Sequence, residues 1–111
     1  MVLSETFSQV KQAIQAGAVH VSVHARDEAA ADELLLQDVE SATLRGDCIE
    51  DYPSDPRGPS CLVFCEIAGR PVHLLWGFDE VCLRAILITV YRPDPDRWSS
   101  DFRTRRRGSA G

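Results

Sequence analysis

The sequence predicts an α+β fold in which N-terminal helices pack on a small antiparallel sheet, followed by a short C-terminal helix. Apolar residues recur at helical spacing before Gly46, whereas apolar, β-branched runs joined by short turns fill residues 47–91. The chain has 111 residues, of which 44% are hydrophobic, and this size suits one compact domain. We expect residues 1–103 to form that domain and residues 104–111 to form a flexible, arginine-rich tail.

Three predicted helices begin or end at residues that favour a helix boundary. Ser4 suits the N-cap of the first helix and Gly17 the position after its end, and Ser22 suits the N-cap of the second. The third has acidic residues in its first turn and Arg45 in its last, as the helix dipole favours, and Gly46 closes it. The expected helices cover residues 4–16, 24–34 and 37–45, and a short strand covers residues 19–23.

The sheet is expected from strand-like runs that follow Gly46. These runs lie at residues 48–52, 61–68, 71–78 and 83–91. A two-residue connection at Gly69-Arg70 and a short turn at residues 79–82 predict that the last three strands form an antiparallel meander. The dipeptide Asp94-Pro95 then suits the start of the C-terminal helix, which would place Trp98 and Phe102 on one face against the body.

The distribution of charge argues against a protein built mainly to bind nucleic acid. The chain carries 12 basic and 17 acidic residues, a net charge of −5. Without the four arginines of residues 103–107, the remaining 8 basic and 17 acidic residues give −9. Such a terminal arginine cluster either lies in solvent or touches RNA or an acidic partner. With no apolar run of about 20 residues and no signal-like N-terminus, we expect a cytoplasmic protein without a membrane span.

The four cysteines do not have the spacing of a zinc site. The close pair, Cys61 and Cys65, lies in a predicted strand, which would separate the two side chains by about 13 Å. We therefore expect small buried side chains at Cys48, Cys61, Cys65 and Cys82, with a metal or redox role as the alternative, and no bound metal or cofactor.

The strand period predicts a polar pair on the face of the sheet that is turned away from the core. We expect the core face to carry Val72, Leu74, Trp76 and Phe78 from one strand and Ile86, Ile88 and Val90 from the next. His73 would then lie on the opposite face beside Thr89 and Tyr91, within reach of either hydroxyl group. A histidine with a hydroxyl partner can act as an acid–base pair. The alternative is a surface histidine and a tyrosine packed under a helix.

A second candidate site lies at the start of the second helix. His24 and Arg26 are close to the predicted N-terminus of that helix, where the dipole favours anions and a neutral imidazole. They could face a phosphate group, with His24 as a base, or His24 could be a partly exposed residue of the first turn. A metal site shared by His24 and His73 has no H-x-E or H-x-x-x-H spacing to support it.

Several short motifs, in this order, resemble one small bacterial family. They are Ser22-x-His24-Ala25, Asp38-Val39, Gly46 followed by Ile49-Glu50-Asp51-Tyr52, Pro71-Val72-His73, and Thr89-Val90-Tyr91-x-Pro93 followed by Trp98. The chain resembles the family called domain of unknown function 4258, which is grouped with RelE/ParE-like toxins, over roughly residues 8–103. The resemblance implies a single RelE/ParE-like domain of two helices on a small antiparallel sheet. It also implies a toxin of a toxin–antitoxin pair, with an antitoxin-like protein and RNA as partners.

The resemblance implies roles for particular residues. The positions that match the family's polar signature are His24, His73, Thr89 and Tyr91, with Glu50 and Tyr52 on the preceding strand. In a RelE-like, metal-independent endoribonuclease, His73 or His24 would be the base and Tyr91 would orient or protonate. Arg26 or Arg92 would stabilise the charge of the phosphorane.

The acidity of the chain motivates a second hypothesis. A nuclease must approach polyanionic RNA, and its affinity depends on neutralising phosphates. A body with a net charge of −9 outside its arginine cluster is repelled by RNA. The alternative function is therefore a non-catalytic module on the same fold that binds a protein partner or forms a homodimer.

Overall fold

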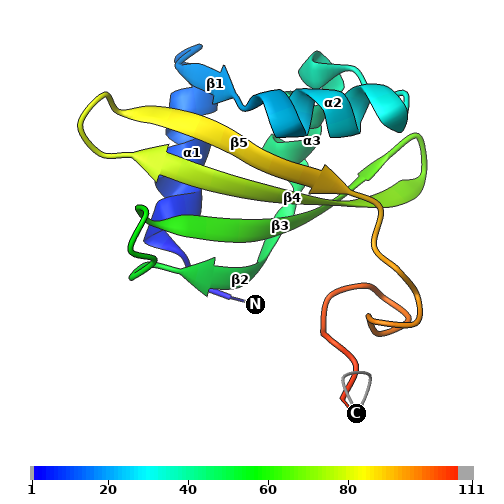
Figure 1. The fold of residues 1–111 in the computed structure, drawn as a ribbon. Coiled ribbons are helices and arrows are strands. Elements are labelled where there is room, and N and C mark those ends of the chain that lie inside the picture. The colour runs from blue at the N-terminus through cyan, green and yellow to red at the C-terminus, as the bar shows by residue number, and fades with distance from the viewer. Residues whose placement is uncertain (1, 108–111) are drawn as a thin grey trace.

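A computed structural model describes residues 2–107 and confirms the α+β class, with helices and one mixed sheet in that region. In chain order the elements are α1 (Glu5–Gln15), β1 (Val19–Val21), α2 (Val23–Ala31), α3 (Leu36–Arg45), β2 (Asp47–Tyr52), β3 (Ser60–Ile67), β4 (Arg70–Asp79) and β5 (Arg84–Tyr91). The strand order is β1-β5-β4-β3-β2, with β1 parallel to β5 and every other neighbouring pair antiparallel. Figure 1 shows α1 and α3 behind the sheet and α2 alongside β5.

Serine side chains begin two of the helices at the predicted positions. Ser4 accepts a hydrogen bond from the Phe7 N–H of α1 at 3.0 Å, and its hydroxyl donates to Asp51 of β2. Ser22 accepts from the Ala25 N–H of α2 at 3.0 Å. Each cap satisfies an N–H group that has no partner within its own helix. The hydrogen bond from the Ser4 hydroxyl to Asp51 also fixes the start of α1 against β2, at the edge of the sheet.

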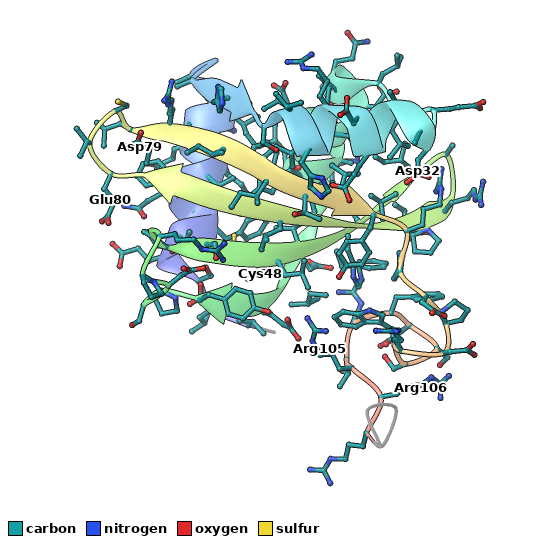
Figure 2. The ribbon with its side chains drawn as sticks, in the orientation of Figure 1. Asp32, Cys48, Asp79, Glu80, Arg105 and Arg106 are labelled. Atoms are coloured by element: carbon teal, nitrogen blue, oxygen red, sulfur yellow. The ribbon has the colours of Figure 1, made fainter. Side chains whose placement is uncertain are left out.

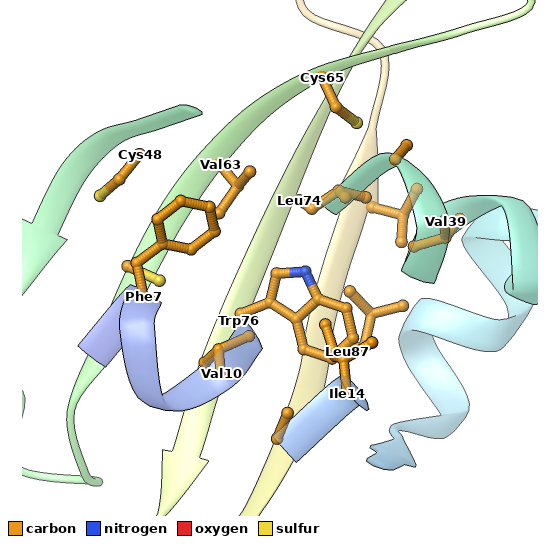
Figure 3. Close-up of a cluster of buried hydrophobic side chains, with 14 of the residues drawn as sticks. Phe7, Val10, Ile14, Val39, Cys48, Val63, Cys65, Leu74, Trp76 and Leu87 are labelled. Carbon is orange, nitrogen blue, oxygen red and sulfur yellow. The ribbon is translucent and has the colours of Figure 1, made fainter. Parts of the chain in front are cut away.

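The core lies between the sheet and helices α1 and α3, and we call the side of the sheet that faces it the inner face. Trp76 has no exposed surface and lies among aliphatic side chains from α1, α3 and neighbouring strands (Figure 3). Its indole N–H donates to the Thr43 hydroxyl at 3.1 Å, and that hydroxyl donates to the Val39 carbonyl of α3. Every polar group carried by these two buried side chains is therefore paired. Gly46 follows the end of α3 and lies against β3. A Cβ at this position would lie 2.7 Å from the Phe64 carbonyl oxygen, so the close approach of the two backbones requires glycine.

A β-bulge between β4 and β5 corrects the predicted faces of β5. The register shifts between Leu75 and Trp76, where Leu75 pairs with Thr89 but Trp76 pairs with Leu87. The core residues of β5 are consequently Ala85, Leu87 and Val90. Ile86 and Ile88, which we expected in the core with Val90, instead lie on the opposite side of the sheet. The extra residue in the bulge reverses the alternation that the sequence pattern suggested.

The hairpin between β3 and β4 turns one residue earlier than we predicted. Ile67 pairs with Arg70, so the two connecting residues are Ala68 and Gly69 and not Gly69 and Arg70. Both connecting residues have positive φ angles, of 54° and 75°. Two positive φ angles are the requirement of a type I′ turn, which matches the twist of the flanking strands.

The predicted short C-terminal helix is wrong. The N–H groups of Arg97 and Trp98 both donate to the Asp94 carbonyl, which makes one turn, and the chain then folds back on itself. The Ser99 N–H donates to the Thr104 carbonyl at 2.7 Å, an antiparallel contact that a helix would not contain. Side chains compete with helical hydrogen bonds here, because the Asp101 carboxylate accepts from the Ser99 hydroxyl and from the backbone N–H two residues ahead.

We call residues 93–107 the C-terminal segment, and it contacts the sheet where we expected a flexible tail from residue 104. Arg103 pairs with Asp47 at 2.7 Å, and Arg105 pairs with Glu50 at 2.8 Å. Both acidic partners belong to β2, and their opposite charges hold the segment across that end of the sheet. The remainder of the predicted tail, residues 108–111, lies outside the described residues.

Candidate functional site

We call the side of the sheet opposite the core the outer face, and it has two parts. The closed half carries Glu50, Tyr52, Phe64, His73 and Tyr91 and is covered by the C-terminal segment. The open half carries Leu75, Gly77, Ile86 and Ile88 and lies beside the β4–β5 turn. Figure 2 shows Asp79 and Glu80 of that turn at one end of the sheet and Arg105 at the other.

His73 and Tyr91 form a hydrogen-bonded pair on the closed half. They are directly opposite each other on β4 and β5, and the His73 Nδ1 lies 3.0 Å from the Tyr91 hydroxyl. The other ring nitrogen, Nε2, lies 2.8 Å from the carbonyl oxygen of Phe102. A carbonyl oxygen only accepts, so Nε2 carries the proton, and in the neutral ring Nδ1 accepts from the Tyr91 hydroxyl. Both nitrogens of His73 are therefore engaged.

Burial keeps both members of this pair neutral. His73 is 0% exposed, and this desolvation lowers the pKa of its imidazole despite the opposing effects of the Phe102 carbonyl and the Glu50 carboxylate. Burial also raises the pKa of Tyr91 to about 12. A neutral imidazole and a neutral phenol at pH 7 form a stable donor–acceptor pair. The pair has no charge to attract an anionic substrate.

Aromatic rings from the C-terminal segment and from β3 surround His73. The Trp98 ring meets the His73 ring edge to face, with centroids 4.4 Å apart and an interplanar angle of 84°. Phe64 of β3 lies on another side of His73 at 6.2 Å. Trp98 and Phe64 are both buried but do not belong to the core around Trp76. The C-terminal segment and the closed half thus form a second, smaller cluster of buried side chains.

Arg105 and Glu50 form a two-pronged ion pair beside this aromatic cluster. The Arg105 Nε and Nη2 atoms donate to the two carboxylate oxygens of Glu50 at 2.8 and 3.0 Å. The Tyr52 hydroxyl, two residues along β2, also donates to Glu50. The Arg105 guanidinium lies over the Trp98 ring, 4.7 Å from its centroid. Burial raises the pKa of Glu50, but Arg105 and Tyr52 outweigh it, so the net pKa is lowered and the carboxylate is ionised.

The remaining predicted site residues lie on or near α2. His24 is 69% exposed, and its Nε2 lies 3.3 Å from Glu28, whose carboxylate accepts the Val90 N–H at 2.9 Å. Arg26 is exposed, and its side chain forms no ion pair or hydrogen bond with residues 2–107. The Arg92 guanidinium donates to the Asp32 carbonyl at 3.4 Å, at the end of α2.

The structure therefore brings together only part of the predicted set. His73 and Tyr91 meet, whereas no hydrogen bond within residues 2–107 joins either of them to His24, Arg26 or Arg92. Thr89, the other hydroxyl considered for His73, is opposite Leu75.

Sequence reasoning identified Trp98 and Phe102 as residues that dock on the body, but it did not show that they cover His73. Trp98 and Phe102 were expected to dock on the body together, but as one face of a helix, and the contact that forms is through the Phe102 backbone carbonyl. The ion pair between Arg105 and Glu50 joins residues 55 positions apart. Because the two residues are so far apart in the sequence, no local pattern predicts that they pair. A cluster of arginines close to an aromatic residue was the available hint.

The open half contains an apolar trough of about 550 Å³. Leu75, Ile86 and Ile88 line it from the sheet, while Asp55, Asp79 and Glu80 are among the residues that line it from the loops. The β4–β5 turn beside it is held in shape by the Asp79 carboxylate, which accepts from the N–H groups of Val81 and Cys82 at 3.0 Å each. This turn presents Val81, 91% exposed, and Leu83, 63% exposed, to solvent.

The cysteines are free thiols, and three of the four are buried as we expected. Cys82 is exposed in the β4–β5 turn, which corrects the expectation of four buried side chains. Burial raises the pKa of Cys65 to about 12, which makes this thiol a poor nucleophile. Within residues 2–107 no three His, Cys, Asp or Glu side chains are grouped so as to hold a metal ion.

Comparison with known proteins identifies a family. Residues 21–92, more than half of the chain, match the family described as Domain of unknown function (DUF4258). That range contains Glu50, Tyr52, His73 and Tyr91, whereas the C-terminal segment that covers them begins after it. No curated protein and no solved structure matched the chain. Among the helices of residues 2–107, none has the length and apolar character to cross a membrane. The chain belongs to the DUF4258 family.

Proposed function

We propose that this chain is a non-catalytic protein-binding module and that a partner segment docks on the open half of its outer face. The observation that carries the proposal is the apolar trough beside an exposed apolar turn whose backbone donates two hydrogen bonds to the Asp79 carboxylate. Adjacent exposed apolar side chains mark interaction sites, and burying a side chain such as Leu83 contributes about 1.5–3 kcal/mol. Because the Asp79 carboxylate already fixes the turn, little conformational entropy is lost when a partner covers it.

The charge around the trough indicates the chemistry of the partner. Asp55, Asp79 and Glu80 line it together with Arg57. Arg57 pairs with Asp55 and Arg84 pairs with Asp79. This leaves Glu80 as the acidic residue of the trough without an ion pair within residues 2–107, and the whole chain carries a net charge of −5. A segment with apolar residues on one side and Lys or Arg on the other complements this surface. An antitoxin-like protein with a basic amphipathic segment is the partner that agrees with the family resemblance. The cytoplasmic location stays a prediction, and the free buried thiols are compatible with a reducing compartment.

The grouping with RelE/ParE-like toxins and the ribonuclease activity stay predictions from the sequence. They rank second here because a general base needs a ring nitrogen that can reach its substrate. Both nitrogens of His73 are bonded to groups of the protein, and the imidazole has no exposed surface. His24 and Arg26 lie on α2 and make no hydrogen bond to the pair formed by His73 and Tyr91.

The binding proposal can be tested with designed peptides and the full chain. We would use two amphipathic helical peptides of equal length with the same apolar face. The polar face carries lysine in one peptide and glutamate in the other. In NMR titrations we expect the lysine peptide to shift amide signals of the open half and the β4–β5 turn. Added salt should weaken this binding, because part of the attraction comes from exposed charges. The glutamate peptide should bind more weakly by at least about tenfold.

Variants in the turn locate the binding surface. Val81→Asp with Leu83→Asp places charge on two exposed apolar residues, which should abolish peptide binding without unfolding the chain. Val23→Asp is the matched control, since Val23 is 76% exposed on α2 and outside the trough. Equal binding of both peptides, or unchanged binding by the turn variant, would contradict the proposal. A dimer in native mass spectrometry that the turn variant abolishes would replace the basic partner with a second copy of the chain.

A growth assay addresses the ribonuclease hypothesis separately. Expression of the soluble chain in a bacterial host should leave growth normal if the chain acts only by binding. Growth arrest that His73→Ala relieves would support the ribonuclease in place of our proposal. The folded state of the variant must be verified by its circular dichroism spectrum, because His73 is buried.

A further inference from the structure

We propose that Glu50 and Tyr52 form a binding site for a guanidinium group, that Arg105 fills it in the free chain, and that an arginine side chain of a partner can take its place. The site lies on the closed half of the outer face, and the proposal does not depend on the trough. Its ligand class follows from the contacts that Arg105 makes.

The site has the geometry that distinguishes guanidinium from ammonium. Two nitrogens of Arg105 meet the two oxygens of Glu50 at 2.8 and 3.0 Å, the parallel arrangement that a planar guanidinium allows. The Tyr52 hydroxyl donates to the same carboxylate and fixes its orientation. The Trp98 ring supplies a flat surface for the guanidinium at 4.7 Å. A lysine would supply one point charge and could not occupy both oxygens in this way.

The carboxylate is the more buried member of the ion pair. The side chain of Glu50 is 23% exposed, whereas that of Arg105 is 62% exposed. A partly buried carboxylate that loses its cation keeps an unfavourable desolvation cost, so an empty site attracts another cation. The Arg105 guanidinium, in contrast, is already mostly in solvent, so its own change in hydration adds little to the cost of the exchange. The acidic half of the pair is therefore the fixed receptor, and the arginine is its exchangeable ligand.

The arrangement of the chain allows Arg105 to leave while the rest of the site persists. Glu50 and Tyr52 belong to β2, inside the range that matches the family, whereas Arg105 belongs to the C-terminal segment beyond that range. Trp98 and the Phe102 carbonyl hold the segment to His73 independently of Arg105. The backbone beyond Phe102 is bonded to residues 97–99, so the movement required is that of the Arg105 side chain, which is 62% exposed and leaves Glu50 and the Trp98 ring when it turns into solvent.

Small cations test the ligand class in the full chain. In Arg105→Ala, we expect ethylguanidinium to shift the signals of the Glu50 amide and the Trp98 indole N–H, with saturation in the millimolar range. Ethylammonium, which has the same charge, should bind at least about tenfold more weakly. The double variant Arg105→Ala with Glu50→Gln should show no saturable shift with either cation. Equal binding of the two cations would overturn the guanidinium assignment, and so would the absence of binding to Arg105→Ala.

A peptide tests whether a partner can replace Arg105. Acetyl-Gly-Arg-Gly-amide should bind Arg105→Ala and produce shifts at the same signals, whereas its lysine analogue should not. The wild-type chain should bind this peptide at least about tenfold more weakly, because Arg105 competes at a high effective concentration. Arg107→Ala, which removes an exposed arginine of the same segment, should behave as the wild type does. Equal affinity for wild type and Arg105→Ala would show that Arg105 does not fill the site that the peptide uses. Variants at Val81 and Leu83 should leave all these results unchanged, which separates this site from the trough.

Discussion

His73 is a buried residue whose protonation state is fixed by two partners of opposite kinds. The Phe102 carbonyl accepts from Nε2 and the Tyr91 hydroxyl donates to Nδ1, so the neutral ring satisfies both hydrogen bonds. A proton on Nδ1 would require the Tyr91 hydroxyl to turn from donor to acceptor, and it would place a positive charge on a ring with no exposed surface. The stability of the chain should therefore depend on pH through this residue.

We predict that wild-type stability falls as the pH decreases below about 6.5 and that His73→Gln reduces this dependence. Burial lowers the folded-state pKa of His73 below the ordinary value of 6.5, so the unfolded chain binds the proton first. The contribution of neutral His73 to the free energy of unfolding is complete above pH 6.5 and is lost as the pH falls toward the folded-state pKa. The free energy of unfolding then changes by at most about 1.4 kcal/mol per pH unit. Urea unfolding at several pH values between about 5 and 8 measures this slope. An equal slope in His73→Gln would assign the pH dependence to other groups.

We predict that Tyr91→Phe lowers the free energy of unfolding by about 1–3 kcal/mol, because the Nδ1 acceptor of His73 is left without a donor. The phenyl ring retains the edge contact with the imidazole, whose centroid lies 5.2 Å away. The decrease in the free energy of unfolding therefore measures the contribution of the hydroxyl group alone. Tyr52→Phe is the control, because Glu50 keeps its two bonds to Arg105 when the Tyr52 hydroxyl is removed. Denaturant unfolding should show a smaller loss for Tyr52→Phe. Equal losses would contradict the importance assigned to the buried acceptor.

Among the elements, the β3–β4 hairpin contains a residue that does not favour its own conformation. Ala68 has a φ angle of 54°, in the left-handed region, which costs a residue with a Cβ about 1–2 kcal/mol. Asparagine adopts this conformation more readily and precedes glycine in the preferred type I′ turn. The neighbouring Gly69 already meets the requirement of the second position.

We predict that Ala68→Asn raises the free energy of unfolding by about 0.5–1 kcal/mol, measured by urea denaturation. The residue is exposed, so the side chain can be enlarged without a steric conflict in the core. Ala68→Val is the control and should lower the free energy of unfolding, because a residue branched at Cβ is strongly disfavoured at positive φ. Stabilisation by valine equal to that by asparagine would show that the backbone angle does not control the effect.

The elements that the sequence could predict are those with local signals. Ser4 and Ser22 cap α1 and α2 at the expected positions, because an N-cap is recognisable from one side chain and its neighbours. The strand period placed His73 on the same face as the hydroxyl groups of Thr89 and Tyr91, and the observed register selects Tyr91 as its partner. The β-bulge on β5 has no comparable signal, and neither has the reversal at Ser99, where side-chain hydrogen bonds replace the helix that Asp94-Pro95 suggested. Periodic patterns therefore predicted the core of β4 but not that of β5.

For the whole molecule, the composition predicted charge but not how the charges pair. A net charge of −9 outside the arginine cluster suggested a body that repels RNA and a tail that extends from it. Arg103 and Arg105 instead neutralise Asp47 and Glu50, which are 56 and 55 positions away. Contacts of this separation depend on the assembled sheet. The same segment places Trp98 and the Phe102 carbonyl against His73, so the candidate site also depends on contacts between distant parts of the chain.

The last prediction concerns this coupling between the C-terminal segment and the sheet. Trp98→Ala should raise the pKa of His73 toward its ordinary value, since burial is the main cause that lowers it and the Trp98 ring packs against the imidazole with centroids 4.4 Å apart. The core around Trp76 does not include Trp98, so the helices and the sheet should keep their packing. An NMR titration of the imidazole signals measures the change, with Arg107→Ala as a control in the same segment. An unchanged pKa would mean that the sheet alone buries His73. A raised pKa would instead show that the C-terminal segment controls both the access of solvent and the protonation state at the candidate site.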